Sequence, residues 1–450
     1  MYKPYKAPVT VASPDVNVPE PKISKFVLFL LNFLCSPYMF FLFGFPKIFL
    51  GRDDILFDAF RRALSKESRC IIAFRHPDGR EPQLLAWFFL FKLRSLAAKK
   101  RVFFPLRPHS IFVYGYEVAR WGGPFARFFM PNIGAIPIHH TKLDSKGMAE
   151  IYKAITGGPY PVSLAPEGQV SYSCDALPRL ETGVIRIGLQ AADRMSTDIL
   201  SDIPVEILPL SIHFRYGNAG KRDMEKLLFN IEKICGFSGR IKGIDFYNRI
   251  KRCRDKILEA NEKRYGIKAD DQNTFEQRLE KVTNAALETA ERLLGIKSEG
   301  DFFARLYKAR HICWDRIFLP ELDRLDKLSK LERSIKDLGA GEAWHIARHQ
   351  ELADFAWYFR HSLPVEETAL HAKIEYVQNL FDFANRSMGG AITERVNIFP
   401  QKIIIQAAPP INLTSRLSDY NQDKKATIES IKSELESAYL NCINEVNKVY

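Results

Sequence analysis

The sequence predicts an α/β protein with a central, mostly parallel sheet flanked by helices, an apolar helical segment near the N-terminus and a helical insertion. Three observations support this fold class. Short apolar runs alternate with helical patterns from about residue 55 to 215, strand signals almost disappear from about 218 to 396, and a β-branched run returns at 402–407. Strands that alternate with helices are typical of a parallel sheet with helical crossovers.

These changes of pattern divide the chain into four expected parts. They are an N-terminal arm with membrane-associated helices (1–54), a core (55–220), a helical insertion (221–397), and a C-terminal strand and helix that complete the core (398–450).

The apolar segment follows a proline-rich arm and spans residues 26–45 (FVLFLLNFLCSPYMFFLFGF). About twenty apolar residues are enough to cross a bilayer. Asn32, Ser36 and Pro37 interrupt the middle of the run, and no small-residue cleavage site of a signal peptide is apparent. We therefore expect two short helices that lie in the membrane interface. A single membrane-spanning helix and a buried hairpin remain alternatives.

The elements of the core follow from hydrophobic periodicity. Expected strands are 70–74, 101–106, 159–165 and 204–212, and expected helices are 55–64, 82–96, 145–155 and 182–192. Further helices are expected in the insertion at 275–295, 321–339 and 370–388, followed by a strand at 402–407 and a helix at 424–449.

Charge and cysteine content limit the possible partners. The net charge is +12, and residues 1–220 carry 27 Lys and Arg against 18 Asp and Glu. A basic half beside an apolar segment suits an anionic membrane surface. No basic run with interleaved aromatic residues occurs, so we expect no nucleic-acid partner. The seven cysteines are widely spaced without a CxxC pair, which argues against disulfides or structural zinc and favours a reducing compartment.

Four of the ten histidines are followed five positions later by a carboxylate, a spacing that can supply a general base and the group that orients it. The pairs are His76–Glu81, His139–Asp144, His349–Asp354 and His361–Glu366. The first pair directly follows the expected strand 70–74, in the turn HPDGREP, and strand ends are where α/β folds place chemistry. The last two pairs fall on charged helices of the insertion, which disfavours them.

A series of four blocks carries a family resemblance. HPDGRE (76–81), GAIPIHH (134–140), PEGQVS (166–171) and ILPLSI (207–212) occur in this order. The series resembles the glycerolipid (lysophospholipid) acyltransferase family, of the 1-acylglycerol-3-phosphate acyltransferase type, over residues 55–215 and the PPIN turn at 409–412. The order also disfavours His139, because only 28 residues separate it from Glu167.

The resemblance implies an O-acyltransferase of phospholipid biosynthesis. Such an enzyme moves a fatty acyl group from acyl-CoA or acyl carrier protein to a hydroxyl of a lysophospholipid or glycerolipid, on the cytoplasmic face of a membrane. It implies no cofactor besides the thioester co-substrate, and membrane lipids as partners. His76 would be the catalytic base, oriented by Glu81 where the family usually has Asp. Substrate-binding roles would fall to Gly134, His140, Glu167, Gly168 and Pro209.

Two departures from the family pattern leave the acceptor open. His140 and Val170 stand where the family usually has arginines that are associated with the acceptor phosphate, and neither offers the bidentate donors of a guanidinium. Phosphate recognition would then need other residues, such as Lys142, Arg120, Arg127 or Arg186. An acyltransferase with a non-phosphate acceptor and a catalytically weakened lipid-binding or scaffold protein remain alternatives. The acyl-chain length, the thioester carrier and the oligomeric state stay open.

One helical face in the insertion resembles a metal site. Glu342, His345 and His349 are spaced at i, i+3 and i+7. Because no second such cluster occurs, a polar surface is the favoured interpretation, and no metal is expected.

Overall fold

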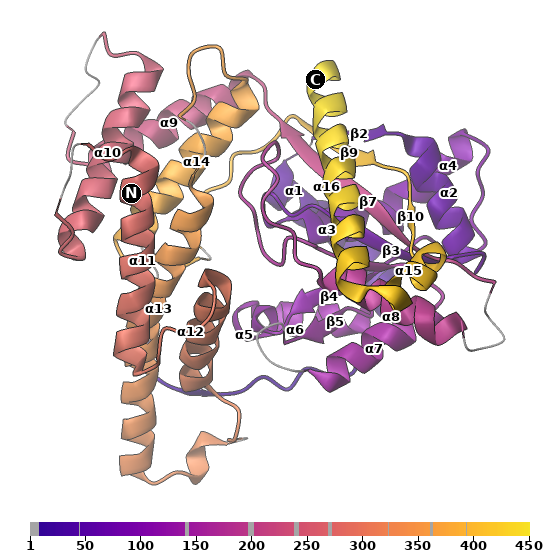
Figure 1. Cartoon of the computed structure of the whole chain (residues 1–450), viewed down its shortest axis with the longest axis horizontal. Coiled ribbons are helices and arrows are strands. Elements are labelled where there is room, and N and C mark those ends of the chain that lie inside the picture. Colours follow the sequence, from indigo (N-terminus) through magenta and orange to yellow (C-terminus); the bar gives the residue numbers. More distant parts are fainter. Residues whose placement is uncertain are drawn as a thin grey trace. The chain divides into compact units, whose positions relative to one another are not determined.

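The computed structural model describes residues 9–44, 46–139, 144–196, 202–237, 243–268, 272–322, 324–360, 363–392 and 394–450. It forms two compact units (Figure 1). The α/β unit comprises Val18–Tyr216 and Phe399–Tyr450, and the helical unit comprises Met1–Asn17 and Gly217–Ile398.

The α/β unit is built on one sheet with the strand order β2-β9-β7-β3-β6-β4-β5. These strands are β2 (Lys47–Gly51), β9 (Lys402–Ala407), β7 (Val205–Arg215), β3 (Arg69–Phe74), β6 (Val162–Leu164), β4 (Ile111–Gly115) and β5 (Ile136–Ile138). All neighbours on this path are parallel except β7 and β9, and the short β10 (Ile411–Asn412) adds an antiparallel partner to β7. The predicted α/β class with a mostly parallel sheet is confirmed.

Helices cover both faces of this sheet because successive strand residues point to opposite sides. On one face Ile72, Phe74 and Leu208 pack with residues of α2 (Asp53–Leu64) and α3 (Glu81–Phe88). On the other face Ile71, Ala73 and Ile207 pack with α7 (Ser145–Gly157), α8 (Gly183–Ser196) and α16 (Lys424–Val449). In Figure 1 the C-terminal helix α16, in yellow, lies across β7 and β9.

Most expected elements of the core are confirmed. Strands occur at 70–74, 159–165, 204–212 and 402–407, and helices occur at 55–64, 82–96, 145–155, 182–192 and 424–449, with small differences at their ends. The expected strand at 101–106 is wrong, because β4 begins only at Ile111. Pro105 and Pro108 lack the backbone N–H that a central strand needs, and Arg101 has a φ of +61°.

The apolar segment forms one helix, α1 (Lys25–Phe43), so the expected division into two short helices is wrong. Pro37 lies inside this helix and forfeits one backbone hydrogen bond, but Leu31 before it and Met39 after it are both buried. Packing on both sides of the proline therefore keeps the helix continuous. By length and composition α1 is sufficient to cross a membrane.

Two short helices follow β4 in the α/β unit. They are α5 (Glu117–Trp121) and α6 (Gly123–Asn132), and they lead to β5.

The helical unit contains α9 (Asn218–Ile234), α10 (Phe246–Arg264), α11 (Phe275–Leu294), α12 (Phe302–Ile317), α13 (Lys330–Tyr358) and α14 (Leu370–Ser387). The expected helices at 275–295 and 370–388 are confirmed. The one expected at 321–339 begins later, at Lys330, and runs to Tyr358. Ser329 and Glu332 form a capping box that sets this start. β1 (Ser13–Pro14) pairs with β8 (Phe318–Leu319) in the same unit.

Candidate functional site

The candidate site lies at the carboxyl edge of the sheet, where four parallel strands end together. In the registers, Ala73 of β3 is beside Leu164 of β6, and Gly115 of β4 is beside Ile138 of β5. β4 and β6 are also parallel neighbours. The residues that follow these strands therefore share one edge, with about 4.8 Å between neighbouring strands.

His76 and Glu81 are in direct contact at this edge. His76 Nδ1 lies 2.7 Å from Glu81 Oε2. Glu81 is the first residue of α3 and is fully buried, and its carboxylate also accepts the backbone N–H groups of Asp78 at 2.7 Å and Gly79 at 2.9 Å. Gly79 has a φ of +103°, a conformation that favours glycine and lets the loop fold around the carboxylate. When Nδ1 donates to Glu81, Nε2 is the ring nitrogen that can accept a proton.

The surroundings of His76 favour its charged form. Burial opposes the imidazolium, but the hydrogen bond to Glu81 and the charges of Glu81, Glu167 and Asp78 outweigh it and raise the pKa of His76 above 6.5. His109 shows the contrast in the same unit. Burial lowers the pKa of His109 to about 4, and the hydrogen bond of its Nε2 with the Ile133 carbonyl does not offset this. The carboxylates around His76 therefore distinguish it from an ordinary buried histidine.

A buried ion pair holds the backbone of His76. The Arg75 side chain is fully buried, and its Nε donates to Glu167 Oε1 at 2.8 Å. Glu167 Oε2 accepts the backbone N–H of His76 at 2.9 Å. The carboxylate of Glu167 thus faces the interior and fixes the start of the HPDGRE loop.

The same arginine organises the segment after β6. It donates to the carbonyls of Ser173 at 3.1 Å, Cys174 at 2.6 Å and Ala176 at 2.7 Å. Arg75 was not among the residues predicted from the sequence. A charged residue at the end of an otherwise apolar strand was the one signal for it.

Two further contacts fix the end of β3. Ser171 N–H donates to the His76 carbonyl at 2.9 Å, and the Tyr439 hydroxyl of α16 donates to the Ala73 carbonyl at 2.8 Å. Gly168 has a φ of +72°, and its N–H donates to the Ala165 carbonyl at 3.1 Å. Gly168 therefore makes the turn that brings Glu167 and Ser171 to His76.

Gly134 is not brought to His76. It precedes β5, at the opposite edge of the sheet, with a φ of +80°. A Cβ at this position would approach side-chain atoms of Ile111 at 2.9 Å and Ile23 at 3.0 Å. The tight packing around position 134 therefore explains why a glycine stands there.

Pro209 lies inside β7, beside Ala73. On its antiparallel side, β7 pairs with β9 from Leu210 onward and with β10 at Ile207. Pro209 lies between these two partner strands, so no ladder hydrogen bond requires the N–H that it lacks. His140 and Lys142 lie outside the described residues.

The competing pair at His139 is arranged differently. Asp144 accepts the backbone N–H groups of His139 at 3.0 Å and Gly147 at 2.8 Å, so its carboxylate caps α7. The His139 ring stacks on Tyr116 with a centroid distance of 4.1 Å.

The arginines considered for phosphate binding have protein partners in the structure. Arg120 is buried near Tyr116, Arg127 donates to the carbonyls of Ala119 and Arg120, and Arg186 donates to Thr182.

The remaining candidates belong to the helical unit. His349 Nδ1 lies 2.9 Å from the Tyr265 hydroxyl, and Asp354 pairs with Arg310 at 2.6 Å. His361 lies outside the described residues. Within the described part of the chain, no group of three or more His, Cys, Asp or Glu side chains is placed to hold a metal ion.

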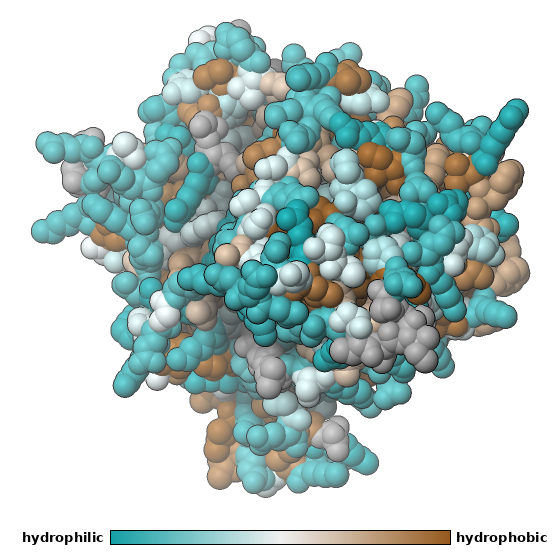
Figure 2. Space-filling model, turned by 45° about the vertical axis from the view of Figure 1, so that its right-hand side comes forward, coloured by the Kyte–Doolittle hydropathy of each residue, from teal (hydrophilic) through white to brown (hydrophobic). Residues whose placement is uncertain are grey.

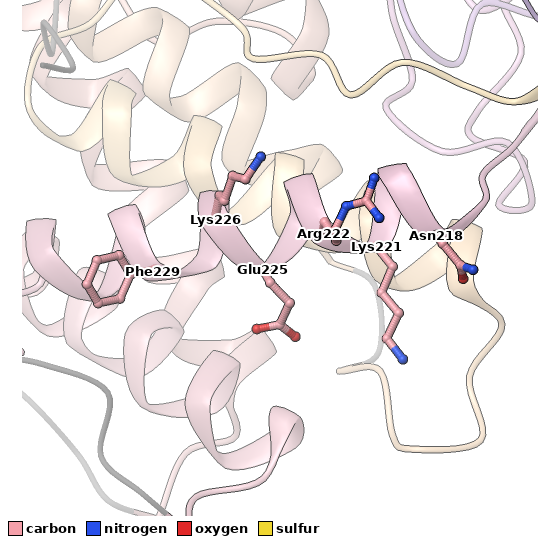
Figure 3. Close-up of a pocket in the computed structure, with 6 residues that line it drawn as sticks. All are labelled: Asn218, Lys221, Arg222, Glu225, Lys226 and Phe229. Atoms are coloured by element: carbon pink, nitrogen blue, oxygen red, sulfur yellow. The ribbon is translucent and has the colours of Figure 1, made fainter.

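A hollow of about 830 Å³ lies along α9 of the helical unit. Its described lining residues all come from this one helix: Asn218, Lys221, Arg222, Glu225, Lys226 and Phe229. Figure 3 shows Lys226 and Arg222 pointing away from the side on which Lys221 and Glu225 extend, so these groups do not converge. None of them is a predicted site residue.

The structure therefore gathers His76, Glu81, Glu167 and Arg75 at one sheet edge and leaves Gly134 at the other. No family model, curated protein or solved structure matches this chain.

Proposed function

We propose that this protein is an O-acyltransferase that moves a fatty acyl group from an acyl thioester to a hydroxyl of a lysophospholipid or glycerolipid at a membrane surface. The observation that carries the proposal is the contact of 2.7 Å between His76 Nδ1 and a buried, doubly hydrogen-bonded Glu81 carboxylate at the carboxyl edge of the sheet. This arrangement provides a base, and a group that fixes its tautomer and stabilises its charged form.

The proposed reaction is a direct transfer. His76 Nε2 takes the proton of the acceptor hydroxyl while the hydroxyl oxygen attacks the thioester carbonyl. The tetrahedral intermediate then expels the thiolate of CoA or acyl carrier protein, the C–S bond breaks, and the imidazolium returns its proton to the thiolate. The products are an ester and a free thiol. General-base catalysis of this kind contributes about 10²–10⁴ in rate.

The rigidity of the loop supports this role. The backbone of His76 is held at its N–H by Glu167 and at its carbonyl by Ser171. Both contacts are independent of the imidazole, so the ring can change protonation without releasing the loop. Positioning of a base before substrate arrives is a large part of its catalytic effect.

The residues near the HPDGRE loop bear on the class of acceptor. Glu167 is already bound to Arg75 and His76, and Val170 Cγ2 would lie 3.4 Å from a Cβ at Gly79. An apolar side chain against the HPDGRE loop favours an acceptor without a phosphate monoester as the second candidate.

An acceptor panel tests both versions. The purified full-length protein is incubated with oleoyl-CoA and vesicles that contain lysophosphatidic acid, lysophosphatidylcholine or monoacylglycerol, and products are identified by mass spectrometry. The proposal expects an acylated product from at least one acceptor, with release of an equal amount of CoA. Acylation of monoacylglycerol alone would identify the non-phosphate version. No acylated product from any acceptor, with either acyl-CoA or acyl carrier protein as donor, would contradict both.

A further inference from the structure

The helix α1 exposes a wide aromatic face along its whole length. The exposed fractions are 70% for Phe26, 60% for Phe29, 63% for Phe33 and 74% for Phe41. By contrast, the face shown in Figure 2 is mostly hydrophilic, with hydrophobic residues in small separate groups. A continuous apolar face of this size marks an interaction surface.

The neighbouring helix α6 extends this face. Phe125 and Phe128 on α6 are 53% and 50% exposed, and Trp121 at the end of α5 is 49% exposed. The Tyr38 and Phe125 rings lie 6.3 Å apart between centroids, which places the two helices side by side.

Backbone contacts fix the two helices to each other. Just before α1, Lys22 N–H donates to the Pro131 carbonyl at 2.8 Å and Ser24 N–H donates to the Asn132 carbonyl at 2.9 Å. Pro131 and Asn132 are the last residues of α6. The aromatic side chains of α1, α5 and α6 therefore belong to one rigid surface, which we call the aromatic face.

The packing of α1 argues that it lies flat. Val27, Leu31, Met39 and Phe43 of α1 are buried, and Met39 and Phe43 belong to the core of the α/β unit. The Phe43 ring stacks on Phe214 of β7 at 6.1 Å. Because its C-terminal end is fixed in this core, α1 fits a position along the bilayer surface better than a crossing, which would bring polar groups of the unit toward the hydrocarbon.

Basic residues flank the aromatic face. Lys22 and Lys25 stand at the start of α1, Arg107 donates to the Asn32 side chain of α1 at 3.0 Å, and Arg127 lies on α6 between Phe125 and Phe128. Each basic group near an anionic bilayer contributes about 1 kcal/mol to binding. Aromatic side chains that are surrounded by basic residues fit the interface of an anionic membrane.

We propose that α1, α5 and α6 form a single docking surface for an anionic bilayer, in which Trp121, Phe125 and Phe128 insert beside α1. This proposal rests on the proposed function in one respect, namely that the acceptor is a lipid in a membrane. Arg80 links this surface to the candidate site, because it donates to the Leu42 carbonyl at the end of α1 and stacks over Phe43 at 4.5 Å. Docking through the aromatic face thus holds the HPDGRE loop beside the bilayer.

The test compares two double variants of the full-length chain. Phe125→Ser/Phe128→Ser removes half-exposed rings of α6, and Leu440→Ser/Val449→Ser removes exposed apolar residues of α16, which packs on the other face of the sheet. Binding is measured by co-flotation with vesicles of phosphatidylcholine alone or mixed with phosphatidylserine. Circular dichroism verifies the fold of each variant.

We expect the wild type and the α16 variant to bind phosphatidylserine vesicles more tightly than phosphatidylcholine vesicles. We expect the α6 variant to bind the mixed vesicles roughly tenfold to a hundredfold more weakly, which corresponds to the loss of about one fully buried Phe. Equal binding by the α6 variant and the wild type would overturn the proposal. So would a wild type that is dimeric without lipid and an α6 variant that is monomeric, because a second copy would then cover the face.

Acyl transfer in detergent micelles separates this proposal from the proposed function. Weak vesicle binding by the α6 variant, in a protein without any transfer activity, would support the docking surface and contradict the enzyme. Unchanged vesicle binding, in a protein that acylates lipid acceptors, would contradict the docking surface alone.

Discussion

Replacing Arg75 by methionine should destabilise the α/β unit strongly. The Arg75 guanidinium is fully buried and donates to Glu167 and to three carbonyls of residues 173–176. Methionine preserves much of the volume but leaves the Glu167 carboxylate buried without its charge partner. Removal of one member of a buried pair costs about 3–5 kcal/mol. Because the lost carbonyl contacts add to this, we expect the free energy of unfolding to fall by at least about 3 kcal/mol.

Amide hydrogen exchange with mass spectrometry is the appropriate assay, because a protein with two units does not unfold in one step. Peptides from β3 and β7 report the stability of the α/β unit separately from the helical unit. Arg186→Met is the matched control, since the exposed side chain of this arginine of α8 makes one hydrogen bond, to Thr182 Oγ1 at 3.0 Å. The control should stay within about 0.5 kcal/mol of the wild type.

A double-mutant cycle with Glu167→Gln tests the reason for the loss. Arg75→Met/Glu167→Gln contains no uncompensated buried charge, so it should be less destabilised than the sum of the single variants. A loss below about 1 kcal/mol in Arg75→Met, or strict additivity in the cycle, would refute the assignment of this pair as the support of the HPDGRE loop.

Four further predictions concern the base and the division of the chain. Glu81→Gln should lower the pKa of His76 in an NMR titration, because it removes the negative charge that offsets the effect of burial on the imidazolium. An unchanged pKa of His76 would mean that Glu81 does not control its protonation. In the wild type, the raised pKa of His76 contributes stability that is fully present below pH 6.5 and is lost as the pH rises through the folded-state pKa. Activity should rise over the same pH interval, because His76 becomes neutral and able to act as a base. Ending the chain at residue 397 removes β9 from between β2 and β7, so the product should be insoluble, and a soluble, active product would contradict the topology. Replacing 218–398 by a short Gly/Ser linker should leave a folded α/β unit, because Arg215 and Lys402 are direct partners in the β7–β9 ladder; loss of exchange protection in β3 would contradict this.

The sequence was sufficient for elements with strong periodicity. Buried strands such as 70–74 and the terminal helix at 424–449 have uninterrupted patterns, and their bounds are close to those observed. β5 has three residues and contains Pro137, so it leaves almost no periodic signal. The continuity of α1 through Pro37 depends on burial of residues far apart in the chain, which the local sequence does not reveal.

The residues of the candidate site also differ in how far the local sequence could predict their positions. The His76–Glu81 contact follows from a local spacing of five residues, and the structure has it. The inward orientation of Glu167 depends on the parallel register of β3 and β6, which places Ala73 beside Leu164. The position of Gly134 at the opposite edge depends on the direction of β5. Registers and directions of strands are tertiary properties, so local motifs could not predict them.

The most direct test of the account is the rate of acyl transfer by His76→Ala. The variant and the wild type are purified as full-length proteins, shown by circular dichroism to have the same fold, and compared for CoA release and ester formation with the acceptor that the panel identifies. We predict that His76→Ala loses about 10²–10⁴ in turnover while it still binds vesicles like the wild type. A folded His76→Ala protein with the turnover of the wild type would contradict the assignment of His76 as the base.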